Sequence, residues 1–130
     1  MVEFTVEEIL VAERALGSIA QAKLPVSVGY QISKLIKVVS DEIRTIRESQ
    51  MKIAEKYGER DEQGMLVERD GVYPIPKENQ EAFNKDMEEL LEVKCNLQIT
   101  PINIEKLGDK IELSVSDLLA LGKFLTEPTE

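Results

Sequence analysis

The sequence predicts an α+β fold that is mainly helical, with four helices, one of them long, and a small antiparallel sheet. A heptad repeat of apolar residues extends over residues 32–57, which is typical of a long packed helix. Helix-capping signals stand at Thr5 and Ser114. Residues 93–99 alternate apolar and polar side chains, as a half-buried strand does. The length of 130 residues fits one domain, residues 1–130.

The first helix is predicted to begin after Thr5 and to extend to about Ala22. The Thr5 hydroxyl can accept a hydrogen bond from the backbone of Glu8, whose carboxylate can reach back to the Thr5 N–H, and this reciprocal pair forms a capping box. Phe4 and Ile9 flank the box as a hydrophobic staple.

The long helix is predicted from about residue 26 to residue 57. Pro25 can occupy its first position, where a missing N–H has no cost, and Gly58 can cap its end. Such a helix packs its apolar stripe against neighbours, and the length of this stripe predicts a homo-oligomer, most simply a dimer. The stripe steps by four and three residues and comprises Ile32, Ile36, Val39, Ile43, Ile46, Gln50, Ile53 and Tyr57.

The remaining elements are shorter. Residues 65–75 predict a hairpin that turns at Asp70-Gly71, because this dipeptide favours tight hairpin turns. Together with residues 93–113 they should form the antiparallel sheet, with Val93, Cys95, Leu97 and Ile99 facing inward, Ile104 resuming the pairing and Gly108-Asp109 turning the chain. Two further helices are predicted, at about residues 77–92 and at about residues 115–125, the second capped by Ser114 and Asp117.

Composition argues against several classes of activity. The chain has no histidine, which removes the usual base near neutral pH, the common imidazole metal ligand and every Ser-His or Cys-His nucleophile pair. Cys95 is the only cysteine, so no internal disulfide can form, and on an apolar strand face it behaves as a small hydrophobe. We therefore expect no enzymatic activity, no catalytic residue, no metal site and no cofactor.

The charge of the chain is acidic and unevenly distributed. A formal net charge of −9 argues against direct binding of DNA or RNA, whose phosphates require a basic surface. No apolar run approaches the roughly 20 residues that cross a membrane, and the N-terminus lacks the layout of a signal peptide. Residues 23–56 nevertheless carry seven Lys/Arg against four Asp/Glu, so one basic segment stands in an acidic chain.

That basic segment contains the best candidate for a binding site, KLPVSVGYQISK at residues 23–34. A helix start offers unpaired N–H groups and a positive dipole end to an anion. Ser27 can add a hydroxyl, Gly29 permits close approach, and Tyr30 can stack on a base. The same residues also suit an ordinary helix start with a solvated outer face, and both interpretations remain open. The candidate ligand-binding residues are Lys23, Ser27, Gly29, Tyr30, Lys34 and Lys37.

The pattern Leu24-Pro25, Tyr30, Ile32 and Lys34, followed by Lys56-Tyr57-Gly58, resembles a family of small proteins of unknown function from tailed phages and prophages of Gram-positive bacteria. The resemblance implies a phage setting and a helix-rich fold, and it supplies no catalytic residue. We expect a phage accessory protein that acts by binding in the host cytoplasm, antagonising host defence by sequestering a signalling nucleotide or blocking a host protein. The alternatives are a virion component or assembly helper, and an acidic mimic of nucleic acid.

Overall fold

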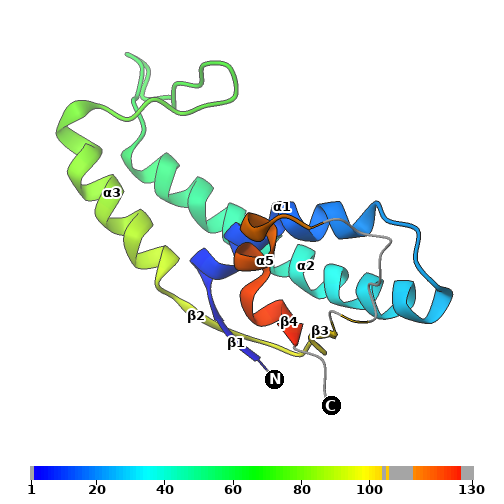
Figure 1. Ribbon diagram of the computed structural model, residues 1–130. Coiled ribbons are helices and arrows are strands. Elements are labelled where there is room, and N and C mark those ends of the chain that lie inside the picture. Colours follow the sequence, from blue (N-terminus) through cyan, green and yellow to red (C-terminus); the bar gives the residue numbers. More distant parts are fainter. Residues whose placement is uncertain (1, 104, 106–112, 127–130) are drawn as a thin grey trace. The chain divides into compact units, whose positions relative to one another are not determined.

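The computed structural model describes residues 2–103, 105 and 113–126 (Figure 1). These residues form two compact units, one of residues up to 43 together with those from 94 onward, and the other of residues 44–93. We call them the first and the second unit. The prediction of one domain stays a prediction.

In chain order the main elements are β1 (Val2–Thr5), α1 (Val6–Ala20), α2 (Val26–Tyr57), α3 (Lys77–Leu91), β2 (Lys94–Leu97), β3 (Ile102–Asn103), α5 (Val115–Leu121), a 3₁₀ turn (Gly122–Phe124) and β4 (Leu125–Thr126).

The predicted fold class is confirmed for the described part of the chain, which has four α-helices and a small antiparallel sheet. The long helix α2 is continuous from Val26 to Tyr57, as its heptad pattern predicts. Its apolar stripe is buried at Ile32, Val39, Ile43 and Ile46 and half-buried at its other positions.

The antiparallel sheet pairs β1 with β2, in a register that sets Phe4 opposite Cys95. The strand within residues 93–99 is confirmed, but its expected partner is wrong. The hairpin at residues 65–75 contributes no strand to this sheet, and the partner is a strand that directly precedes the first capping box. Val93 was expected to face inward, but it lies before the strand begins and is 48% exposed.

A second, parallel pair joins β3 to β4, with Ile102 opposite Leu125. Helix α5 begins at its predicted capping box, in which Ser114 and Asp117 bond reciprocally. The predicted extension of this helix to residue 125 is wrong, because Gly122 takes a positive φ of 42° and the chain turns through a 3₁₀ segment into β4. Ile104, the expected turn at residues 108–109 and the pairing expected up to residue 113 lie mostly outside the described residues.

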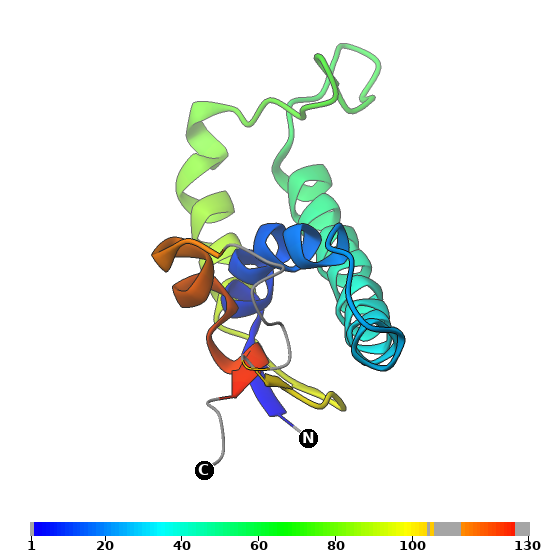
Figure 2. The same ribbon diagram turned by 45° about the vertical axis from the view of Figure 1, so that its right-hand side comes forward.

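The core of the first unit is formed by α1, the first part of α2, the two strand pairs and the C-terminal segment. Helix α5 packs against α1, and the two lie side by side in both ribbon views (Figures 1 and 2). Burial of a large apolar side chain contributes about 1.5–3 kcal/mol, so this cluster dominates the stability of the unit. Its fully buried members of largest volume are Phe4, Phe124, Ile9, Ile19 and Leu121.

The second unit is held together around Tyr57, the last residue of α2. The Tyr57 hydroxyl donates to the Asp86 carboxylate of α3 at 2.8 Å, and the Asn79 side chain donates to the Tyr57 carbonyl oxygen at 3.0 Å. The predicted turn is confirmed, since Asp70 and Gly71 both have positive φ between bridged residues 69 and 72. Among residues 44–93 the structure buries only Ile46 and Gly58, so this unit has little core of its own.

Candidate functional site

The six candidate residues lie around the start of α2, and all belong to the first unit. Pro25 was expected at the first helical position, but it stands one residue before it, because its carbonyl oxygen accepts the first helical hydrogen bond, from the Gly29 N–H at 2.9 Å. The Gly29 N–H is therefore already bonded within the helix. The unbonded N–H groups that helix geometry leaves at this end are those of residues 26–28.

Tyr30 and Lys34 lie together on the solvent side of α2, as their spacing of four residues predicts. The Tyr30 side chain is 65% exposed, and the Lys34 ammonium lies 5.4 Å from the centre of its ring. At this distance the ring quadrupole attracts the cation, by about 0.5–1 kcal/mol at an exposed site. The pair therefore presents an aromatic surface and a positive charge together, which is the combination that binds a base and its phosphate.

Two hollows lie along this part of α2, and three of the six candidate residues line them. Lys34 lines a hollow of about 260 Å³ that α2 forms with residues 98–100. Gly29 and Lys37 line another, of about 450 Å³, that α2 forms with the end of α1 and the linker after it. Lys23 and Ser27 are exposed near the helix start. The structure thus places all six residues in one region of the first unit, but it does not gather them into a single pocket.

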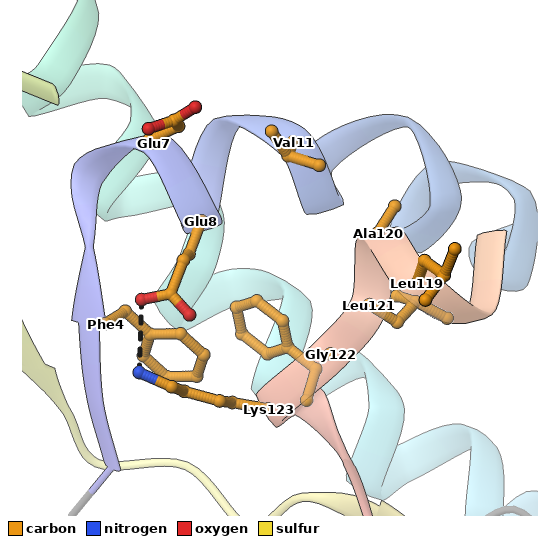
Figure 3. Close-up of a pocket in the computed structure, with 10 residues that line it drawn as sticks. Phe4, Glu7, Glu8, Val11, Leu119, Ala120, Leu121, Gly122 and Lys123 are labelled. Carbon is orange, nitrogen blue, oxygen red and sulfur yellow. Dashed lines mark hydrogen bonds and ion pairs between the residues drawn. The ribbon is translucent and has the colours of Figure 1, made fainter. Parts of the chain in front are cut away.

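Sequence reasoning missed a third hollow, of about 190 Å³, which lies between α1 and the C-terminal segment (Figure 3). The rings of Phe4 and Phe124 stack there, with centroids 4.3 Å apart and planes inclined by 18°. Val11 and Leu119 stand at its rim (Figure 3). Phe4 was assigned to a hydrophobic staple and residue 124 to a helix, so no local signal indicated that the two rings would meet.

The charged groups of this hollow form a compact cluster. The Lys123 ammonium donates to the Glu8 carboxylate at 3.1 Å (Figure 3). It also donates to the Glu3 carbonyl oxygen at 3.0 Å. The same Glu8 oxygen accepts from the Thr5 N–H at 2.9 Å, which completes the predicted capping box. The Thr5 N–H, and after it the Lys123 ammonium, hold the pKa of the Glu8 carboxyl below its ordinary value, against the opposing effect of burial.

Cys95, on β2, is half-buried beside the Glu42 carboxylate of α2. Burial first, and then this negative charge, raise the pKa of the Cys95 thiol to about 11. A thiol with so high a pKa is protonated near neutral pH and is a poor nucleophile.

Neither a metal site nor a membrane-spanning helix is found in the described part of the chain. No group of three or more Asp, Glu or Cys side chains among residues 2–103, 105 and 113–126 is arranged to hold a metal ion. None of the helices in these ranges is both long and apolar enough to cross a membrane.

The chain matches no family model, no curated protein and no solved structure.

Proposed function

We propose that the chain is a non-enzymatic accessory protein of a phage, which acts in the host cytoplasm by binding and antagonises host defence by sequestering a signalling nucleotide. The observation that carries the proposal is the exposed Tyr30 ring with the Lys34 ammonium held against it, next to the start of a long helix. An aromatic side chain that is 65% exposed has a cost in water, and a ligand that stacks on it removes that cost.

The chemistry of a nucleotide suits the two ends of this site. Its phosphates would meet the free N–H groups of residues 26–28 and the positive end of the α2 dipole, together with the Lys34 ammonium. Its base would stack on the Tyr30 ring, an interaction of about 1–3 kcal/mol. In a homo-oligomer, Lys23 or Lys37 of a neighbouring copy would close the site over the phosphates.

The net negative charge of the protein disfavours long polyanions as ligands and leaves small anions. With a net charge of −9, the chain repels long polyanions such as DNA or RNA, whereas a small anion can reach a local basic surface. Because the attraction acts between exposed charges, binding should weaken as ionic strength rises.

A second candidate function, a virion component or assembly helper, is favoured by the second unit. Its helix α3 has no buried residue, and the apolar side chains of that helix, Phe83, Met87, Leu90 and Leu91, are only half-buried. A stripe of this kind is typical of a helix that packs against another copy or a partner. This candidate predicts no affinity for nucleotides.

A thermal-shift screen of cyclic and linear nucleotides tests the proposal. A ligand at 100 times its Kd raises the free energy of unfolding by about 2.7 kcal/mol, which raises the Tm by several degrees. We expect such a rise for at least one nucleotide, and we expect Tyr30→Ala and Lys34→Ala to abolish it. Lys52→Ala, which removes another exposed lysine of α2, should leave it unchanged. No shift with any nucleotide, together with the protein present in purified phage particles, would favour the structural role instead.

A further inference from the structure

The hollow between α1 and the C-terminal segment has the size of one large side chain. Its volume is about 190 Å³, and the Phe4 and Phe124 rings form part of its wall. An apolar cavity of about 150 Å³ is sufficient to bind benzene. A phenylalanine, tryptophan or leucine side chain therefore fits this space, whereas an extended ligand does not.

The surface around the hollow is unusually apolar. Val11 of α1 is 54% exposed, and Leu119 of α5 is 78% exposed. Val115, one helical turn before Leu119, is 74% exposed, so that α5 presents two large apolar side chains on one face. Single exposed apolar residues are ordinary, but Val11 and Leu119 at the rim of an apolar hollow, with Val115 one helical turn away, indicate a surface that another molecule covers.

The charges at the rim indicate the nature of that molecule. The Lys123 ammonium is already engaged by the Glu8 carboxylate, the Glu3 carbonyl oxygen and the face of the Phe4 ring, so it offers little to a ligand. Glu7 also lines the hollow and makes no ion pair with any residue that the structure describes. Among the residues that the structure describes here, the charge left for a partner at this rim is therefore negative.

We infer that this hollow is the docking point for a basic segment of a partner protein, which inserts one large apolar side chain between α1 and α5 and places a lysine or arginine against Glu7. Charge complementarity favours such a partner over a second copy of the chain, because the net charge of −9 on each copy opposes their approach, whereas a basic segment is attracted. The residues that form this surface belong to other elements than the Tyr30–Lys34 pair, so the inference is independent of the proposed nucleotide site.

Selection from a random 16-residue peptide display library on the immobilised full-length protein tests the inference. We expect enrichment of peptides that carry phenylalanine, tryptophan or leucine within one helical turn of a lysine or arginine. The affinity of an enriched peptide should fall at least tenfold in Val11→Lys and in Leu119→Lys. Val72→Lys is the matched control, because Val72 is the same residue type at 64% exposure in the second unit, and it should bind the peptide as the parent protein does.

Glu7→Gln isolates the contribution of charge. It should weaken binding severalfold at low salt and reduce the salt dependence of the affinity, while circular dichroism shows an unchanged helix content. Three results would each overturn the inference: no enrichment, enrichment of acidic or uncharged peptides, or equal binding to the Val11→Lys and Val72→Lys proteins. A self-association of the parent protein that Leu119→Lys abolishes would also overturn it, since a second copy would then be the occupant.

Discussion

At the scale of single residues, one carboxylate oxygen of Glu8 serves two elements. It accepts a hydrogen bond from the N–H of Thr5, the residue that caps its helix, and another from the Lys123 ammonium, 115 positions further along the chain. The first contact fixes the start of α1, and the second ties the C-terminal segment to it. Because this carboxyl has a lowered pKa, its stabilising effect is complete above the pKa of an unfolded glutamate and is lost as the pH falls through the lower value of the folded state.

Cys95 gives a test of electrostatics at the same scale. Its pKa of about 11 predicts that the native thiol reacts with a disulfide reagent at pH 8 roughly a hundred times more slowly than the thiol of the urea-unfolded chain, because only the thiolate reacts. The rate should rise about tenfold for each pH unit up to pH 10, since the thiolate fraction rises by that factor below the pKa. Equal rates for the native and unfolded chains would show that neither burial nor Glu42 protects the thiol.

At the scale of elements, local chemistry made the helix starts predictable. The capping boxes at Thr5 and Ser114 are confirmed, and each depends only on side chains three residues apart. The range of α2 could likewise be predicted, since its stripe, its proline and its terminal glycine are all local signals. Strand pairing was not predictable in this way, because β1 and β2 meet across about 90 positions of the chain and nothing local specifies the partner.

The end of α2 provides an element-scale prediction. Gly58 was expected as a helix cap, but it does not have the positive φ that is typical of a capping glycine. The neighbouring atoms leave no room for a side chain, which explains why a glycine stands there. A Cβ there would lie 2.6 Å from Leu66 Cδ1 and 2.7 Å from the Ala54 carbonyl oxygen. We expect Gly58→Ala to lower the free energy of unfolding by roughly 1–3 kcal/mol in urea titrations, since the backbone must shift.

Gly17 is the matched control for this change. It lies inside α1, and a Cβ there would meet nothing within 4 Å. Gly17→Ala should therefore stabilise the protein by about 0.5–1 kcal/mol, through the higher helix propensity of alanine. A Gly58→Ala protein as stable as the parent would show that the contact at the end of α2 relaxes without cost.

Some features of the candidate site could be predicted from the spacing of residues along the chain, and others could not. Tyr30 and Lys34 are four residues apart, so they lie on the same side of a helix, and in the structure the Lys34 ammonium lies against the Tyr30 ring. The close approach of a ligand that was expected at Gly29 stays a prediction, and the Gly29 N–H begins the helical hydrogen-bond ladder. The hollow at Phe4 and Phe124 was missed, since its two walls come from opposite ends of the chain and only the folded structure brings them together.

At the scale of the whole molecule, the second unit predicts self-association. Residues 44–93 bury only Ile46 among their large apolar side chains. Ile53 of α2 and Phe83 and Met87 of α3 are half-buried, and the protein gains stability when another copy covers these side chains. Light scattering at micromolar concentration should give about twice the monomer mass of 14.7 kDa. Ile53→Lys should reduce this mass, whereas Met51→Lys, off the stripe and 50% exposed, should not. A monomeric mass for the parent chain would reject the dimer.

The central claim is that a small anionic ligand binds at the start of α2, and an NMR titration of the labelled full-length protein with cyclic and linear nucleotides tests it most directly. We predict that at least one nucleotide saturably shifts the amide resonances of residues 26–28 together with those of Tyr30 and Lys34, and that added salt weakens the effect. The account would be contradicted if every nucleotide left these resonances unmoved, or if the shifts fell on residues outside the first turns of α2.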